Sequence, residues 1–444
     1  MANIPGFPFP YFEVQFDQEG DVVDRSEVDK VLDFVSQQTI SDLFIISHGW
    51  NNDMNEARGL YKSFFDRVNY IASSGKVPGI ESRKFAVLGI MWPSKKFADE
   101  ELIASGAAGI SSAVTVDFLQ KQLDNLKGVF DKPGADDDIE KAKQLVPRLE
   151  DSPKAQHDFA DLIRQLPKRR DTNPEDASDR FFTLDGNELM KRLSKPAFAP
   201  PAHSGTAGGT TAIRSLGGPS GGAAGIGSLF SGIKSAARNL LNFTTYYQMK
   251  ERAGVVGRSG VNQLIREIQA RAPKIKTHLI GHSFGGRLVT AAAFGPDDNQ
   301  PPIKVKTMTL LQAAFSHNGF AKHFDGSNDG FFRRVVTEGR ISGPILITCS
   351  KNDKAVGIAY PLASLLAGQN ATGVGDKNDP FGGIGRNGAQ RTPEASDVAL
   401  NPVGGAYQFQ SGKLYNLNGD TLIMGHSDIS KDEIAYALLA TIPP

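Results

Sequence analysis

The sequence predicts an α/β protein, with a mostly parallel central sheet flanked by helices and a large, mainly helical insertion. Continuous apolar runs such as residues 43–46 are typical of strands covered on both faces. Apolar residues at helical spacing separate these runs, and this alternation favours parallel strands joined by helices. Between about residues 95 and 250 the alternation stops. We therefore expect a core made of two separate stretches of chain.

Residues 1–94 are expected to form the N-terminal part of this core. Residues 11–16 alternate in character, which is typical of an edge strand. Asp53 and Glu56 have the spacing of a capping box, which predicts the start of a helix. The strands expected here lie at residues 11–16, 22–23, 43–46 and 85–91.

Residues 95–250 are interpreted as the helical insertion, or cap. A glycine-rich tether at residues 204–232 holds ten glycines in twenty-nine residues. A structureless loop of that length is unusual inside a compact domain, so we expect a mobile tether there. The helices expected in the insertion lie at residues 118–130, 139–149, 159–166 and 229–247.

Residues 251–444 resume the alternation and are expected to complete the core. A helix is expected to begin after Ser259, and another spans residues 287–294. Ser430 and Glu433 have the spacing of a capping box for the closing helix. The strands expected here lie at residues 276–280, 305–311, 344–348 and 413–417.

The composition narrows the class of function. Forty-nine basic and forty-nine acidic residues leave no net charge, which argues against nucleic-acid binding through a basic field. The single cysteine, Cys349, excludes an internal disulfide framework and thiolate-rich metal sites. The N-terminus lacks the features of a secretory signal, and no apolar stretch is long enough to span a bilayer. We expect a cytoplasmic protein; specialised export, transient contact with a membrane surface and the oligomeric state stay open.

The strongest motif is Gly281-His282-Ser283-Phe284-Gly285, which lies between a predicted strand and a predicted helix. A serine at such a sharp turn is held in strained backbone, and the flanking glycines leave room for the bend. The helix that follows offers N–H groups and a positive dipole end to an oxyanion. Ser283 is therefore the candidate nucleophile.

These residues resemble the α/β-hydrolase superfamily, particularly its lipase and esterase branch. The resemblance covers residues 10–94 and 255–444 but not the insertion. It implies that the acid and the histidine follow the nucleophile along the chain, which points to Asp353 and His426. Asp325 is the reserve candidate for the acid. The rival candidates for the histidine follow the strand at 305–311 and are His317 and His323.

The resemblance also implies an oxyanion hole in the loop at residues 47–52. Its donors would be the backbone N–H groups of Trp50 and Phe284. Side chains expected to line the substrate pocket neighbour these motifs: His48, Trp92 and His282.

We expect a serine hydrolase that cleaves a carboxylic ester through Ser283, His426 and Asp353. Its substrate would be a small-molecule or lipid ester, with no metal and no cofactor. Two alternatives remain. The same residues could serve thioester, amide or acyl-transfer chemistry, or the chain could be a non-catalytic scaffold that binds a partner through its insertion.

Overall fold

The computed structural model describes most of the chain. The described ranges are residues 4–37, 39–50, 52–94, 114–168, 173–194, 232–296, 301–353, 377 and 381–442. The tether expected at residues 204–232 lies outside them except for its last residue.

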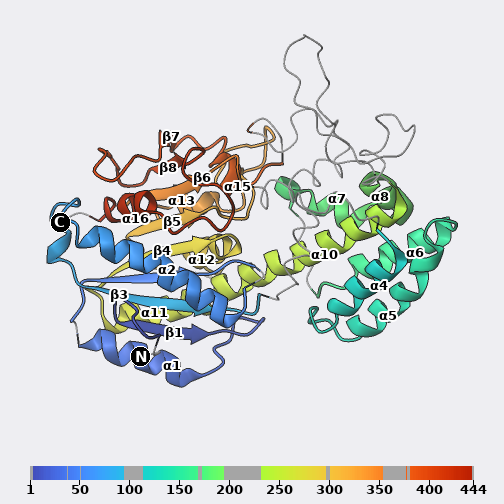
Figure 1. Ribbon diagram of the computed structural model, residues 1–444, viewed down its shortest axis with the longest axis horizontal. Coiled ribbons are helices and arrows are strands. Elements are labelled where there is room, and N and C mark those ends of the chain that lie inside the picture. Colours follow the sequence, from blue (N-terminus) through green and yellow to red (C-terminus); the bar gives the residue numbers. More distant parts are fainter. Residues whose placement is uncertain are drawn as a thin grey trace, which may run out of the picture.

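Within these ranges the strands form one eight-stranded, all-parallel sheet (Figure 1). Its strand order is β1-β3-β2-β4-β5-β6-β8-β7. Parallel neighbours need a crossover between them, and here these crossovers supply the flanking helices. The expected α/β class with a parallel sheet is therefore confirmed. The strands are β1 (Tyr11–Gln15), β2 (Asp42–Ser47), β3 (Phe85–Met91), β4 (Lys276–His282), β5 (Thr307–Leu311), β6 (Ile345–Cys349), β7 (Ala395–Ala399) and β8 (Leu414–Asn418).

Two strands differ from the expectation. The sequence pattern missed β7, an edge strand whose residues are exposed or half-buried, because no apolar run marks it. The short strand expected at residues 22–23 is wrong, since Val22 forms only an isolated bridge with Phe16. The Asp17 carboxylate accepts hydrogen bonds from two backbone N–H groups of the intervening turn. This tight turn leaves too few residues for a ladder of β-sheet hydrogen bonds.

Helices cover both faces of the sheet and enclose two apolar cores (Figure 1). Neighbouring strand residues point to opposite faces, so Leu279 belongs to one core and Ile280 to the other. One core receives α1 (Arg25–Ser36), α11 (Asn262–Arg271), α12 (Phe284–Phe294) and α13 (Arg333–Thr337), and the other receives α2 (Met54–Ala72) and α16 (Asp432–Leu439).

The helix starts were predicted with mixed success. Asp53 and Glu56 form the expected capping box at the start of α2. The capping box expected at Ser430 is wrong, because α16 begins after Lys431 and no side chain caps it.

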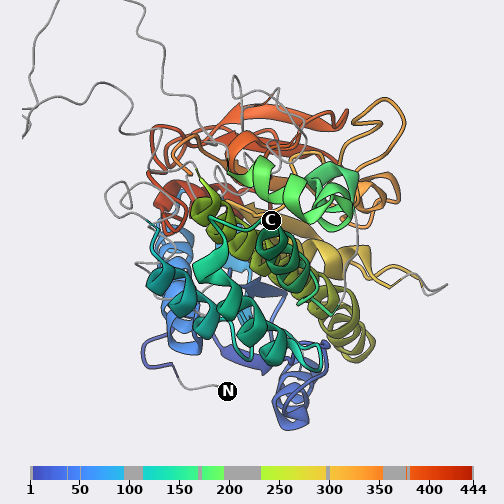
Figure 2. The same cartoon turned by 90° about the vertical axis from the view of Figure 1, so that its right-hand side faces the viewer.

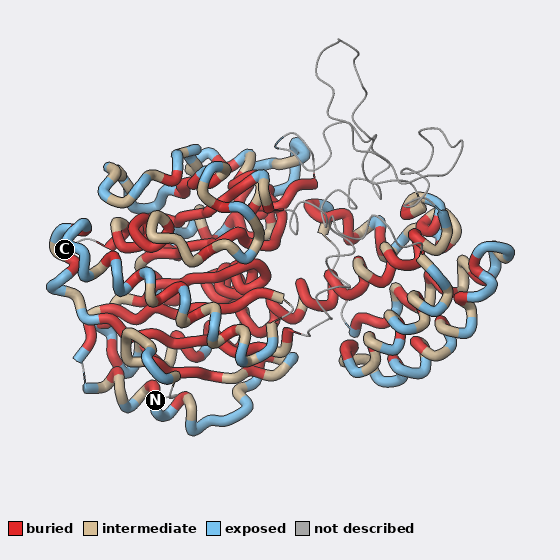
Figure 3. Tube along the Cα trace, in the orientation of Figure 1, coloured by how far each residue is buried: buried red, intermediate tan, exposed pale blue. Residues whose placement is uncertain are grey.

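A helical segment lies between β3 and β4 in the sequence, and Figure 2 shows it in front of the sheet. Its long helix α10 is buried along most of its length (Figure 3), and it packs on α12. In the described ranges, no helix combines the length and apolar character that crossing a membrane requires. The helices of the segment are α4 (Val116–Asn125), α5 (Ala135–Leu145), α6 (Pro153–Arg164), α7 (Ser178–Thr183), α8 (Gly186–Leu193) and α10 (Ile233–Val255).

The chain stays helical from α10 through a π-helical turn (Val256–Val261) into α11, where the sequence suggested a break before a new helix. The glycines in this stretch serve close packing. A Cβ atom on Gly257 would lie 2.1 Å from the carbonyl oxygen of Leu288, and one on Gly260 would lie 2.3 Å from that of Gly20. The glycines therefore let one continuous helix approach α12 and the turn after β1.

A buried polar cluster joins the amino ends of β2, β4 and β5. The Asp42 carboxylate accepts hydrogen bonds from Arg83 Nε at 2.8 Å, Ser41 Oγ at 2.6 Å and His278 Nε2 at 3.0 Å. His278 Nδ1 lies 2.8 Å from Thr307 Oγ1. Burial alone would raise the pKa of Asp42, but these hydrogen bonds outweigh it and lower the pKa to about 2.

The lowered pKa predicts that Asp42 stabilises the fold above about pH 4 and loses this contribution as the pH falls towards 2. A shift of nearly two pKa units corresponds to about 2 kcal/mol. Asp42→Asn should lower the thermal midpoint at pH 7 and should reduce the difference between the midpoints at pH 7 and pH 3.

The matched control is Asp158→Asn, which removes an exposed carboxylate paired with Lys154. Exposed ion pairs contribute little, so its midpoints should follow the wild type at both pH values. If Asp42→Asn and Asp158→Asn gave the same pH dependence, the cluster would not stabilise the fold in this way.

Candidate active site

Ser283 lies at a sharp bend between β4 and α12. Its φ of 56° and ψ of −125° place a non-glycine residue in strained backbone, which typically costs about 1–3 kcal/mol. Its N–H donates to the carbonyl of Leu311 at 3.1 Å, and its own carbonyl accepts from the N–H groups of Gly286 at 3.0 Å and Ala314 at 2.9 Å. These hydrogen bonds tie the bend to the neighbouring segments and hold the strain in place.

The glycines on either side of Ser283 are required by close contacts between main-chain atoms. A Cβ atom on Gly281 would lie 2.4 Å from the carbonyl oxygen of Gly285. One on Gly285 would lie 2.1 Å from the carbonyl oxygen of Ser47. Main-chain atoms cannot move aside as a flexible side chain can, so both positions accept only glycine if α12 is to begin this close to β2.

A continuous chain of hydrogen bonds joins Ser283, His426 and Asp353. Nε2 of His426 lies 2.8 Å from Oγ of Ser283, and Nδ1 lies 2.8 Å from Oδ2 of Asp353. A carboxylate only accepts hydrogen bonds, so Nδ1 carries the proton and Nε2 is left to accept the serine proton. The structure thus brings together the three residues that the sequence put forward, although 143 positions separate Ser283 from His426.

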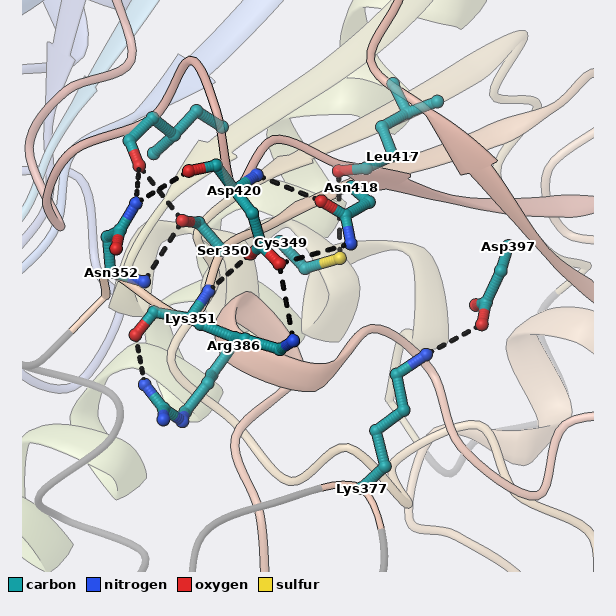
Figure 4. Close-up of polar contacts among 11 residues, drawn as sticks. Cys349, Ser350, Lys351, Asn352, Lys377, Arg386, Asp397, Leu417, Asn418 and Asp420 are labelled. Atoms are coloured by element: carbon teal, nitrogen blue, oxygen red, sulfur yellow. Dashed lines mark hydrogen bonds and ion pairs between the residues drawn. The ribbon is translucent and has the colours of Figure 1, made fainter. Parts of the chain in front are cut away.

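Two loops that carry Asp353 and His426 are tied to each other at the carboxyl ends of β6 and β8 (Figure 4). Asn352 Nδ2 donates to the carbonyls of Asp420 and Ile423, at 2.9 Å each. The hydroxyl of Ser350 also donates to the Ile423 carbonyl, at 2.9 Å. These contacts fix the position of the acid relative to the histidine loop.

The Ser283 side chain is largely enclosed by its neighbours. Ser283 is only 5% exposed, whereas the side chain of His426 is 21% exposed. Part of the cover is Gly49, where an added Cβ atom would lie 2.5 Å from Cβ of Ser283. The imidazole is therefore the most exposed member of the hydrogen-bonded chain.

His48 and Trp92 support the loop that follows β2. Trp92 Nε1 donates to the His48 carbonyl at 3.0 Å, and the two rings stack with centroids 5.7 Å apart. The Tyr61 hydroxyl accepts from the His48 N–H at 2.8 Å. Burial lowers the pKa of His48 to about 4, so its ring is neutral. Both side chains are 1% exposed, and their role in a substrate pocket stays a prediction.

Trp50 and Phe284 pack against each other. Their rings meet edge to face at 6.0 Å, and the Phe284 ring also meets Tyr246 of α10 at 5.3 Å. Phe284 is the first residue of α12, so its N–H has no acceptor within the helix. This N–H belongs to the positive end of the helix dipole, directly after Ser283.

The rival residues are held elsewhere. The Asp325 carboxylate is exposed and accepts from Ser327 and Asn328 of its own turn. His317 is fully buried, with Nδ1 3.1 Å from Asn387 Nδ2, and the exposed His323 has Nδ1 3.1 Å from the Asp329 carboxylate.

Sequence reasoning missed Gln312, which follows β5 as Ser283 follows β4. Gln312 is fully buried and has a φ of 38°, which glycine adopts more readily. Its side-chain Nε2 lies 3.4 Å from the carbonyl oxygen of Gly425, the residue before His426. The sequence signal that could have identified Gln312 is a single polar residue directly after an apolar strand, at the carboxyl edge of the sheet where Ser283 also lies.

Comparisons with known proteins add no family assignment, because no protein-family model, no curated protein and no solved structure matches the chain. Within the described ranges, His, Cys, Asp and Glu side chains form no group of three or more that could hold a metal ion.

The strain at Ser283 can be measured without knowledge of any activity. Ser283→Gly removes both the hydroxyl and the strained Cβ, whereas Ser283→Ala removes only the hydroxyl. Relief of strain outweighs the extra backbone entropy of glycine, so the glycine variant should be the more stable by about 1 kcal/mol in urea unfolding. A glycine variant less stable than the alanine variant would show that the bend is not strained.

Proposed function

We propose that the protein is a serine hydrolase that cleaves a carboxylic ester through Ser283, His426 and Asp353. The observation that carries the proposal is the unbroken chain of hydrogen bonds from the serine hydroxyl through the imidazole to a buried carboxylate. Surface serines rarely have such partners, and a serine nucleophile needs a base oriented by a third group. The strained bend at Ser283 gives further support.

In the first half of the proposed reaction, Ser283 Oγ attacks the acyl carbon while His426 Nε2 takes the hydroxyl proton. The carbonyl π electrons move to oxygen and form a tetrahedral oxyanion. When this intermediate collapses, the bond to the alcohol breaks and the imidazolium gives its proton to the leaving oxygen. The Asp353 carboxylate accepts a hydrogen bond from Nδ1–H of His426 throughout the reaction and stabilises the imidazolium.

In the second half, a water molecule attacks the acyl-enzyme and gives a proton to His426 Nε2. The ester bond to Ser283 breaks, the proton returns to Oγ, and the carboxylic acid leaves. The enzyme is regenerated with its protons in their original places, so the cycle needs neither an oxidant nor a cofactor.

The backbone N–H groups of Trp50 and Phe284 are the proposed donors to the oxyanion. Phe284 is favoured by its place at the first position of α12, and Trp50 by its place after Gly49, which contacts Ser283. Loss of one such donor typically costs about 10²–10³-fold in rate. A Cβ atom on Gly49 would displace this loop or the serine, which explains the glycine.

We further infer that the chain has the architecture of the α/β-hydrolase superfamily, with the helical segment as its cap. The support is the parallel sheet, the bend after β4 and the contact of α10 with the site through Tyr246 and Phe284. Arg252 of α10 also donates to the carbonyl of Pro93, just after β3, at 2.7 Å. The cap would shape the pocket for the acyl group.

Labelling by a fluorophosphonate tests the nucleophile directly. The wild type should be labelled on the peptide that contains Ser283, and Ser283→Ala should abolish the label. Ser82→Ala, which changes an exposed serine, should leave labelling unchanged. A folded wild type that resists the reagent, and whose helical segment retains a protein partner, would instead favour the non-catalytic scaffold.

Hydrolysis of p-nitrophenyl esters of increasing acyl length tests the reaction type. The wild type should cleave these esters much faster than the matching anilides, and Ser283→Ala or His426→Ala should lower kcat by about 10⁴–10⁶-fold. Removal of one member should cost about as much as removal of both, because the two act as a unit. Faster turnover of thioesters or anilides would assign the same residues to thioester or amide chemistry.

A further inference from the structure

The main chain around His426 is held on both sides by buried side chains from the sheet. Nε2 of His282 lies 2.9 Å from the carbonyl oxygen of His426. Nε2 of Gln312 lies 3.4 Å from the carbonyl oxygen of Gly425. These carbonyls belong to the two peptide units on either side of the His426 Cα atom. Both peptide units that set the position of the His426 side chain therefore contact side chains from the sheet.

The hydrogen-bonding role of His282 follows from its acceptor and its burial. A carbonyl oxygen only accepts, so Nε2 of His282 must carry a proton. His282 is 3% exposed, and its burial, together with the nearby His426, lowers its pKa to about 3. It is therefore neutral, with Nδ1 unprotonated, and no hydrogen-bond partner of Nδ1 is found in the described part of the chain. A neutral ring 4.9 Å from the His426 ring also avoids repulsion of the imidazolium formed during catalysis.

The orientation of Gln312 is fixed by a second contact. The hydroxyl of Thr348 on β6 donates to Oε1 of Gln312 at 2.7 Å, and the Gln312 N–H donates to that hydroxyl oxygen at 3.1 Å. Because Oε1 accepts there, the amide nitrogen must face Gly425. The strained φ of Gln312 places the side chain in this position.

Both donors stand at the carboxyl ends of two central strands of the sheet. His282 is the last residue of β4 and pairs in register with Leu311, and Gln312 directly follows Leu311. The two side chains therefore project from neighbouring strands at the same edge of the sheet. The segment they contact, between β8 and α16, has no regular secondary structure of its own.

We propose that His282 and Gln312 are positioning residues that clamp the two peptide carbonyls flanking His426 and so set the reach of its imidazole to Ser283. The proposal rests on the proposed hydrolase function. It assigns these residues no contact with the substrate. A misplacement of about 1 Å in a reacting group can cost about 10²-fold in rate, so loss of one clamp has a measurable cost.

The first experiment compares His282→Leu with His282→Gln in ester hydrolysis. Leucine keeps apolar bulk but has no donor, whereas the glutamine amide can donate to the same carbonyl. We expect His282→Leu to lower kcat by about 10–100-fold with KM changed less than twofold. We expect His282→Gln to recover most of this loss. His323→Gln, an exposed histidine away from the clamp, should match the wild type.

Gln312→Met is the second test, because methionine has similar length and no donor. It should lower kcat in the same manner as His282→Leu. The double variant should lose less than the product of the two single losses, since both clamps hold one segment. If either single variant unfolds, as judged by circular dichroism, the other and His282→Gln carry the test.

A measurement independent of activity separates this proposal from the proposed function. The proton on Nδ1 of His426, bonded to Asp353, should give a far-downfield proton resonance that His426→Ala removes. His282→Leu and Gln312→Met should broaden or shift that resonance even if the wild type hydrolyses no ester. An unchanged resonance, or wild-type kcat in both variants, would overturn the clamp.

Discussion

All eight strands of the described sheet run in the same direction, and the position of every residue in the candidate site depends on this constraint. In a parallel sheet the carboxyl ends of the strands meet along one edge, where crevices between loops form ligand sites. Ser283, Asp353 and His426 follow β4, β6 and β8 in turn, and Trp50 follows β2. Loops that are far apart in the sequence are therefore side by side in space, because the strands that precede them pair: β2 with β4, and β6 with β8.

The same edge concentrates strain and buried polar groups, which cost free energy unless neighbours satisfy them. Two residues directly after adjacent strands, Ser283 and Gln312, have positive φ angles, and both are held by hydrogen bonds to the next strand or its loop. Neutral buried histidines hold the loops on either side of Ser283: His48 the loop after β2, and His282 the loop after β8. The loops of the site are thus held mainly by hydrogen bonds that side chains donate to main-chain carbonyl oxygens.

Local patterns predicted the parallel sheet and the position of Ser283, because each has a short-range signal, whereas Asp353 and His426 were predicted from the chain order that the resemblance to α/β-hydrolases implies. Apolar runs mark strands, and the glycines around Ser283 mark a bend that only small residues fit. Where the signal was non-local, the prediction was wrong or missing. The continuous helix through Gly257 depends on close packing against α12, and exposed β7 has no apolar run. The contacts of Gln312 are with Thr348 and Gly425, which are distant in the sequence.

The long sequence separation between Ser283 and His426 has a consequence for the protein during its synthesis. A ribosome that has just added the serine must still add β5, β6, β7 and β8 before the imidazole exists. Until the last of these strands joins the sheet, the hydroxyl has no base and is as weak a nucleophile as any free serine. Under the proposed function, the growing polypeptide cannot attack esters near the ribosome, and its reactivity appears only once folding is complete.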